Sequence, residues 1–364
     1  MLVVVLPGNV DDPATPSGGN VYDRQVCAGL VAAGWPVREI AMPGGWPRPD
    51  EATRVALGHT LAGLPDATVV LIDGLVACGV PDVIAAHTER LRLAVLVHLP
   101  LADETGLAPA DAAALDAAER AVLTGAAAVV ATSDATARQL TKRHRLAPDR
   151  VRVAVPGVAA APLTAGDTAG GRLLCVASVT PRKGHDVLVD ALAEIADLSW
   201  TCVCVGALDA DAHVANVRSR IARHGLADRV RLVGPLAGRA LDDAYADADL
   251  LILPSHAETY GMVVTEALAR GVPVLASRVG GVPQALGLAG DGTVPGILVP
   301  PGDPAVIGAA LRGWLGDADR RTRLRAAAAR RRSALPSWAD TTAAVSAVLV
   351  ELHRRHEGST YGDD

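Results

Sequence analysis

The chain of 364 residues has no phenylalanine and no uninterrupted apolar run that approaches the length of a membrane-spanning helix, which is about twenty residues. Residues 1–6 are apolar, but no positive charge precedes them and Pro7 ends the run. This start predicts a first strand and does not fit a signal peptide. We therefore expect a cytoplasmic protein without a transmembrane segment.

Cysteine is scarce as well. The five cysteines are odd in number and scattered, and none shows the paired spacing of a zinc site or a disulfide framework. Cys202 and Cys204 lie two apart in an apolar run, which places both on one face of a strand, where core packing is the usual role. We expect no bound metal, and the scattered thiols agree with a reducing compartment.

Positive charge is almost confined to arginine, because Lys142 and Lys183 are the only lysines among 34 basic side chains. Forty acidic side chains outnumber them, and the net charge of −6 argues against a protein that grips the phosphates of nucleic acids. An arginine-favouring composition explains most of this bias, but it makes each lysine worth locating. Asp149 interrupts the basic stretch 138–152, which we interpret as a solvated surface in preference to a peripheral contact with a membrane.

Half of the residues are hydrophobic and 20% are charged, a composition typical of globular proteins, and the length suggests two domains at about 150 residues each. Short strand-like runs alternate with helical stretches, which predicts an α/β fold of parallel sheets covered on both faces. The expected strands are 2–6, 37–41, 68–72, 94–98, 128–132 and 151–155 in the first half, and 172–177, 200–205, 230–233, 250–253, 272–276 and 296–299 in the second.

A stretch rich in proline, glycine and alanine, residues 156–171, separates the two sets of strands and continues neither periodicity. We therefore expect two Rossmann-like domains, residues 1–160 and 170–336. A last helix is expected at about 338–357, and the residues after it are expected to fray.

Ligands of parallel sheets bind at the carboxyl ends of the strands, and two loops there carry cations or glycines. Gly18 and Gly19 precede a helix whose first N–H groups favour an anion, although a plain loop before a helix has the same pattern. Arg182 and Lys183 follow the first strand of the second half, where a guanidinium and an ammonium group could together neutralise a diphosphate. The alternative for them is two exposed cations on a turn.

The third loop is the most informative. Glu258 closes it, Gly261 opens a helix, and Glu266 lies inside that helix. The free N–H groups of a helix start favour phosphate, and carboxylates on either side accept hydrogen bonds from hydroxyl groups. A nucleoside diphosphate sugar presents its groups in that order: sugar hydroxyls, diphosphate, ribose hydroxyls. Taken singly, each acid would be an ordinary solvated side chain.

These features together resemble glycosyltransferase family 4, whose GT-B fold has two Rossmann-like domains with parallel sheets facing a central cleft. The resemblance covers nearly the whole chain, and the segment with Glu258 and Glu266 is its most specific part. The other segments that carry it are Ser17-Gly18-Gly19, Pro181-Arg182-Lys183-Gly184, Val233-Gly234 and residues 248–255.

The resemblance implies a hexosyltransferase that moves a sugar with retention from a UDP- or GDP-sugar to a small, soluble hydroxyl acceptor, without a metal or another cofactor. Glu258 would bind the donor sugar, Glu266 the ribose and Lys183 the diphosphate. His98 would lie beside the transferred sugar and act with Glu258 and Lys183 in catalysis, the alternative being a histidine packed in the core. Further donor contacts are implied at Gly18, Gly19, Arg182, Gly234, Tyr260, Gly261, Met262 and Val263. The last helix would pack back on the first domain.

One position departs from the family pattern, since Ala177-Ser178 stands where the family often has Gly-Arg. Either Arg182 supplies the missing cation or the diphosphate binds more weakly. The alternatives to a transferase are an epimerase or hydrolase that acts on nucleotide sugars, and a nucleotide-sugar binder without turnover.

Two Asp-x-Asp segments, Asp209-Ala-Asp211 and Asp247-Ala-Asp249, match the spelling that binds a metal in glycosyltransferases of the other major fold. Asp249 leads into an expected strand and Asp209 begins a turn into a helix, where aspartate caps well. We therefore assign both segments to structure. No pattern in the chain identifies the acceptor or the oligomeric state.

Overall fold

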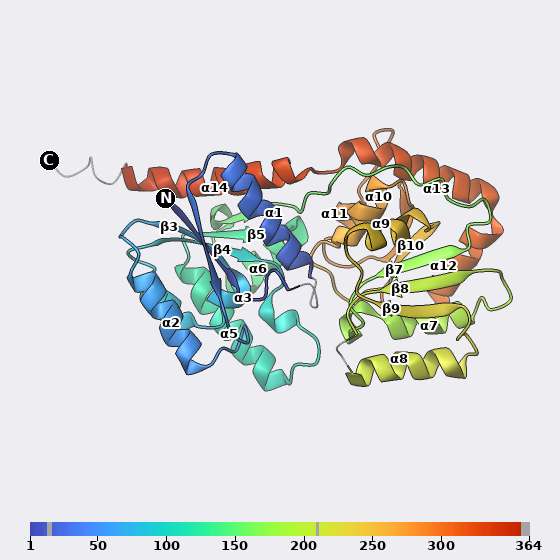
Figure 1. Cartoon of the computed structure of the whole chain (residues 1–364), viewed down its shortest axis with the longest axis horizontal. Helices are drawn as coiled ribbons and strands as arrows, with labels where there is room; N and C mark the ends of the chain where they lie inside the picture. The colour runs from blue at the N-terminus through green and yellow to red at the C-terminus, as the bar shows by residue number, and fades with distance from the viewer. Residues whose placement is uncertain (13–16, 209–210, 358–364) are drawn as a thin grey trace. The chain divides into compact units, whose positions relative to one another are not determined.

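The computed structural model describes residues 1–12, 17–208 and 211–357. The chain divides into two compact units (Figure 1). Unit 1 comprises Met1–Gly157 and the segment that begins at Pro336, and unit 2 comprises Val158–Leu335. Each unit contains one six-stranded sheet in which every neighbouring pair of strands is parallel.

The sheet of unit 1 has the strand order β2-β1-β3-β4-β5-β6. Alternate residues of β1 enter different cores, because successive side chains of a strand point to opposite faces. Val3 and Val5 pack in one buried cluster, while Leu2, Val4 and Leu6 pack in the other. The strands are β1 (Leu2–Pro7), β2 (Val37–Met42), β3 (Val69–Asp73), β4 (Arg92–Val97), β5 (Ala128–Ala131) and β6 (Val151–Val153).

The helices of unit 1 cover both faces of its sheet. The last of them, α14 (Trp338–Glu357), packs along α1 (Gly18–Ala32) in unit 1, and Figure 1 shows the red and blue helices side by side. Trp35 Nε1, just after α1, donates to Ser346 Oγ of α14 at 2.9 Å. The others are α2 (Glu51–Ala62), α3 (Gly74–Ala77), α4 (Pro81–Ala85), α5 (Pro109–Gly125) and α6 (Asp134–His144), with the 3-10 turns η1 (Leu101–Asp103) and η2 (Pro148–Arg150).

The sheet of unit 2 has the order β12-β11-β10-β7-β8-β9. Its strands are β7 (Arg172–Val176), β8 (Thr201–Val205), β9 (Val230–Gly234), β10 (Leu250–Leu253), β11 (Val274–Ser277) and β12 (Gly296–Val299). Its helices are α7 (His185–Ala193), α8 (Asp211–Arg223), α9 (Gly238–Ala246), α10 (Met262–Ala269), α11 (Val282–Leu286), α12 (Pro304–Gly316) and α13 (Ala318–Arg331), with η3 (Pro181–Lys183) and η4 (Arg332–Ala334).

Asp249 is a structural carboxylate at the start of β10. It is fully buried, accepts hydrogen bonds from the backbone N–H groups of Asp167 and Arg172, and pairs with the guanidinium groups of Arg172 and Arg325. These contacts hold the pKa of Asp249 below its usual range against the opposing effect of burial. The interpretation of this acid as structural agrees with its contacts, while Asp209 lies outside the described residues.

The prediction of an α/β fold with parallel sheets is confirmed, and all twelve expected strands are present with ends that shift by at most two residues. One shift matters for the site, because β4 ends at Val97 and leaves His98 in the loop that follows. Within residues 1–12, 17–208 and 211–357, no helix combines the length and the apolar character that a membrane crossing needs.

Candidate functional site

In unit 2, η3 and the loop after β10 bring together four polar side chains, which we call the Lys183 cluster: Arg182, Lys183, Ser255 and Glu258. Lys183 Nζ donates to Glu258 Oε1 at 2.6 Å, and Ser255 Oγ donates to the same oxygen at 2.7 Å. The Lys183 side chain is 18% exposed and the Glu258 side chain 7%. The two residues that the sequence assigns to diphosphate and sugar therefore form a largely desolvated ion pair.

Arg182 joins the same carboxylate from the other side. Its guanidinium donates to the carbonyl oxygen of Ala257 at 3.2 Å and lies 3.9 Å from Glu258 Oε2, with 16% of the side chain exposed. Two cations thus share one carboxylate. A second positive group therefore stands beside Lys183 in this chain, although Ala177-Ser178 replaces the Gly-Arg pair that the family often has.

The loop that carries Glu258 runs into α10 through Gly261. Gly261 has φ +90°, a left-handed conformation that glycine adopts without strain. No side chain caps α10, so the first N–H groups of the helix, including those of Met262 and Val263, have no partner within the helix. This helix start can accept an anion, as the sequence predicts.

Glu266 lies one turn inside α10 and has a partner that the sequence did not indicate. The hydroxyl group of Tyr245, on α9, donates to Glu266 Oε2 at 2.7 Å. Burial raises the pKa of Glu266, and the Tyr245 hydroxyl opposes that rise. The guanidinium of Arg270 covers the Tyr245 ring at 4.6 Å from its centre. Tyr245 therefore fixes the orientation of the carboxylate that the sequence assigns to the ribose.

Two further predicted contacts of unit 2 have different surroundings. Gly234 ends β9 with φ +79°, and a Cβ atom there would meet open space. Tyr260 is buried, with 3% of the residue exposed, and burial raises its pKa to about 12. Both residues are buried, and both remain predictions as donor contacts.

In unit 1, His98 follows β4 and contacts two carboxylates that sequence reasoning missed; we call Asp23, Asp73 and His98 the His98 cluster. His98 Nε2 donates to Asp23 Oδ1 at 2.8 Å and lies 3.5 Å from Asp73 Oδ2. Asp23 is on α1 and Asp73 ends β3, and they are 2% and 5% exposed. The topology explains the contact, because β3 and β4 are neighbours and end at the same edge of the sheet.

The charges of the His98 cluster are balanced internally. Burial alone would lower the pKa of His98, but Asp23 and then Asp73 outweigh burial and raise it to about 9, so the imidazole is cationic near neutral pH. Burial and the charge of Asp23 raise the pKa of Asp73 to about 7. Asp23 Oδ2 is buried and accepts no hydrogen bond from the residues that the structure describes. A proton held by Asp73 would satisfy it.

Neighbouring groups hold the His98 ring in place. A Cβ atom added at Gly19 would lie 3.3 Å from the ring, so the helix start approaches His98 closely. The Tyr22 ring meets His98 edge to face, with ring centres 5.1 Å apart, while its hydroxyl group donates to the carbonyl oxygen of Ala154 at 2.9 Å. Ser17 caps α1 by accepting from Asn20 N at 3.0 Å. Of the two alternatives for His98, the partly exposed side chain at a loop fits a site better than a fully packed core position.

A groove of about 1170 Å³ between α1 and α14 lies apart from these clusters. Its walls are mostly alanine and other small residues, and none of the predicted site residues lines it.

Comparison with known proteins shows a family match within unit 2. Residues 168–331 match the family model "Glycosyl transferases group 1". A D-inositol 3-phosphate glycosyltransferase of Kineococcus radiotolerans is 35% identical over 251 residues, which cover 62% of this chain and 57% of that protein. One from Thermobispora bispora is 36% identical over 248 residues, covering 63% and 57%. The chain thus spans a little over half the length of the curated relatives that it matches.

Solved structures extend the likeness to nearly the whole chain. A sucrose-phosphate synthase from Thermosynechococcus elongatus has a TM-score of 0.80 at 22% identity and covers 98% of this chain and 100% of that one. HepE of Anabaena in complex with UDP-glucose has a TM-score of 0.74 at 18% identity, covering 96% and 100%. At such low identity these structures show the fold.

Two α/β units with six-stranded parallel sheets, matched in this way along the chain, define the GT-B fold. Residues 168–331, within unit 2, match the glycosyl transferases of group 1, which is glycosyltransferase family 4, and the whole chain has the GT-B fold. The fold expected from the sequence is therefore confirmed, and the match over residues 168–331 agrees with the expected family. The central cleft between the two domains stays a prediction.

Proposed function

We propose that this chain transfers a sugar from a nucleoside diphosphate sugar to a hydroxyl group of a small-molecule acceptor, with retention of the anomeric configuration. The observation that carries the proposal is the Lys183–Glu258 ion pair of 2.6 Å, which precedes the uncapped start of α10. In this chain a desolvated cation, a carboxylate and free helix N–H groups occur together, as binding of a sugar diphosphate requires.

Donor binding would exchange partners within the Lys183 cluster. In the ligand-free protein Glu258 neutralises Lys183, and Arg182 lies beside the same carboxylate. A diphosphate is the stronger partner for two cations, so it would draw Lys183 and Arg182 away from Glu258. The released carboxylate could then accept hydrogen bonds from sugar hydroxyl groups. Both cations would keep an anionic partner, and the Glu258 carboxylate would keep hydrogen-bond donors in Ser255 and the sugar, which limits the penalty of a buried ion.

Glu266 would hold the ribose of the donor. Its Oε2 already accepts from Tyr245, which leaves Oε1 to accept from a ribose hydroxyl group. Burial raises the pKa of Glu266, and the Tyr245 hydroxyl favours the ionised form that accepts. Tyr245 would therefore act as a positioning residue for the ribose.

The chemical step would be mainly electrostatic. As the bond from the sugar to the diphosphate breaks, negative charge grows on the diphosphate, where Lys183, Arg182 and the start of α10 stabilise it. The anomeric carbon develops positive character, and the acceptor oxygen attacks it from the face that the diphosphate leaves. A phosphate oxygen of the leaving group takes the proton of the acceptor hydroxyl group. We assign the cationic His98 to a hydrogen bond with the transferred sugar.

The acceptor is proposed to be a small polar molecule with free hydroxyl groups. The support is the name of the relatives, which describes a glycosyltransferase acting on D-inositol 3-phosphate. A phosphorylated polyol is the acceptor class to test first.

The test uses the two lysines of the chain as a matched pair. Lys183→Ala should abolish the rise in melting temperature that UDP or GDP gives and should lower kcat by about 100-fold or more. Lys142→Ala, which removes an exposed lysine of α6, should change neither. Equal behaviour of the two variants would contradict the assignment of Lys183.

Product analysis separates the remaining alternatives. NMR of the product formed from UDP- and GDP-sugars with polyol phosphates should show a retained anomeric configuration, and an inverted product would end the proposed chemical step. Release of nucleotide without an acceptor would instead favour a hydrolase. Tight binding of the donor with no turnover of any acceptor would favour the binder.

A further inference from the structure

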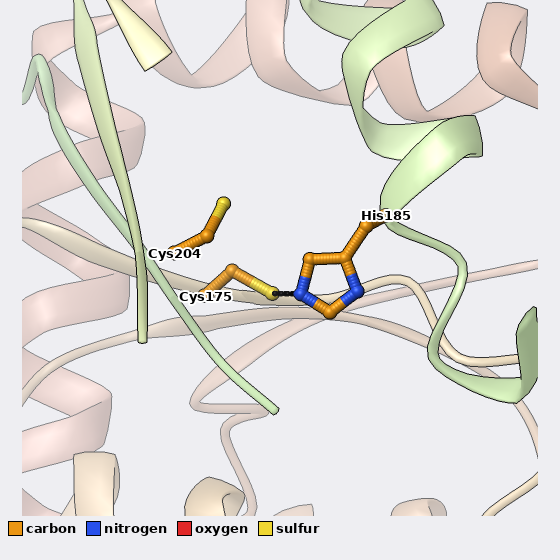
Figure 2. A group of neighbouring side chains, drawn as sticks. All are labelled: Cys175, His185 and Cys204. Atoms are coloured by element: carbon orange, nitrogen blue, oxygen red, sulfur yellow. Dashed lines mark hydrogen bonds between the residues drawn. The ribbon is translucent and has the colours of Figure 1, made fainter. Parts of the chain in front are cut away.

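Two thiol groups and an imidazole, those of Cys175, Cys204 and His185, meet in the core of unit 2. No local motif in the sequence predicts this cluster. Cys175 and Cys204 are the penultimate residues of β7 and β8 and pair directly in the register of the sheet. His185 is the first residue of α7, which packs on that face. Figure 2 shows the Cys175 sulfur pointing at the His185 ring, with the side chain of Cys204 beside it.

We propose that Cys175, His185 and Cys204 form a zinc site. Their ligand atoms lie within 4.8 Å of one another. Cys175 Sγ is 3.6 Å from His185 Nε2. A tetrahedral zinc with Zn–S of about 2.3 Å and Zn–N of about 2.05 Å separates sulfur and nitrogen by about 3.6 Å. One edge of the coordination shell is therefore present already, and the other ligand atoms need to move by about 1 Å at most.

The chemistry of the three groups selects the metal class. Two thiolates and a neutral imidazole are ligands for zinc and other soft cations, whereas magnesium and calcium require oxygen ligands. The three residues are buried, with exposures of 0%, 1% and 2%. Zn²⁺ with two thiolates has no net charge, so the complex suits a place where an uncompensated charge would be expensive. A monovalent cation with two thiolates would leave one negative charge there.

The polar atoms of the cluster have few hydrogen-bond partners among the described residues. The contact from Cys175 to His185 is a weak sulfur hydrogen bond, and His185 Nδ1 is buried without a partner among the described residues. His213, on α8, also has a buried ring nitrogen, Nε2, without a hydrogen-bond partner in the described part of the chain. Because α7 and α8 pack together, His213 is a candidate for the fourth ligand.

The sequence predicts that the cysteines pack in the core, and this is the alternative to zinc binding. Cys202 distinguishes the two accounts. Cys202 is as buried as the others and lies on the same strand and face as Cys204, but it does not belong to the cluster. If the thiols are only packing groups, the three cysteines should be equivalent in a metal measurement. If the cluster binds zinc, only two of them should matter.

The full chain is unfolded, refolded with one equivalent of ZnCl₂, dialysed and analysed for metal by mass spectrometry. We expect about one zinc per chain in the wild type and in Cys202→Ser. Cys204→Ser and His185→Gln should lose most of the bound zinc, because each removes a ligand. Circular dichroism of each variant shows whether it has folded.

Cobalt gives a readout that does not depend on any variant. Wild-type chain refolded with CoCl₂ should show the intense visible bands of a tetrahedral site and the ultraviolet band of cobalt–thiolate bonds. Wild-type chain that retains no zinc and shows no cobalt–thiolate band would overturn the proposal, and so would zinc that is lost equally in Cys202→Ser and Cys204→Ser. His213→Gln tests the fourth ligand, and unchanged affinity would assign that position to another group.

Discussion

The charge state of His98 follows from Asp23, and Asp23→Asn removes that cause while keeping the shape of the side chain. A pKa raised from 6.5 to about 9 corresponds to about 3 kcal/mol in favour of the imidazolium form. Without the charge of Asp23, burial lowers the pKa and only Asp73 opposes it. We therefore expect the pKa of His98 to fall to its ordinary value or below, so that the ring is mostly neutral near neutral pH.

NMR titration of the His98 ring measures this directly, with His98→Gln to assign its signal among the ten histidines. Asp73→Asn is the informative comparison, since the amide imitates the protonated carboxyl that a pKa of about 7 allows. It should lower the pKa of His98 much less than Asp23→Asn does. The control is Asp149→Asn at an exposed position of η2, which should have no effect.

The same variant tests stability and activity with a definite sign. A folded-state pKa above the unfolded value means that the His98 contribution to stability is complete below about 6.5 and disappears as the pH rises through about 9. Urea unfolding should show this loss in the wild type and not in Asp23→Asn. If His98 acts as a cation, kcat/KM should begin to fall at a lower pH in Asp23→Asn than in the wild type, because the pKa of His98 is lower. A wild-type His98 that titrates near 6.5, or a titration that Asp23→Asn leaves unchanged, would refute the reasoning.

Two further outcomes are expected from buried hydrogen bonds. Tyr245→Phe removes the hydroxyl that donates to Glu266, so the donor KM should rise about tenfold with kcat little changed, and the rise should be larger at low pH because the pKa of Glu266 increases further. An unchanged KM would contradict the positioning role. Glu119→Ala leaves the buried His144 and the N–H group of Leu101 without their acceptor, and urea unfolding should show a loss of about 3–5 kcal/mol. A loss below about 1 kcal/mol would contradict this, because it would mean that water replaces Glu119 as the partner of His144 and Leu101.

The strands were predictable because a strand that is buried on both faces needs a continuous run of apolar residues, which is visible in the sequence. Parallel strands such as Leu250–Leu253 are short, continuous apolar runs flanked by turn-forming residues. This pattern can be recognised without information on distant residues. Their ends were less predictable. Val97 and His98 lie side by side in the chain, and hydrogen bonding to a neighbouring strand, which has no local signature, decides which of them ends β4.

The candidate site was predictable where its residues share a loop and not where they meet through the fold. Arg182 with Lys183, and Glu258 with Gly261, are close in the sequence and carry their chemistry visibly. Asp23 had no such signal, because it is one acid on an amphipathic helix until the sheet brings His98 to it, 75 residues further along. Tyr245 and Glu266 are 21 residues apart on different helices, so their hydrogen bond depends on how these helices pack.

The described clusters have one property that constrains how substrates can bind. Ionised groups in these clusters already have polar partners: Lys183 has Glu258, Glu266 has the Tyr245 hydroxyl group, and His98 has Asp23. A buried charge without a partner would be destabilising by several kcal/mol, so the ligand-free fold requires this pairing. At these side chains a substrate can bind by replacing one partner with a group of the same sign or by using a free lone pair. A diphosphate can replace Glu258 at Lys183, whereas a ribose hydroxyl, being neutral, can only add to Glu266. The affinity for the donor should therefore depend mainly on the exchange of Glu258 for the diphosphate at Lys183. The selectivity among donors should depend on the hydroxyl groups that add to residues such as Glu266.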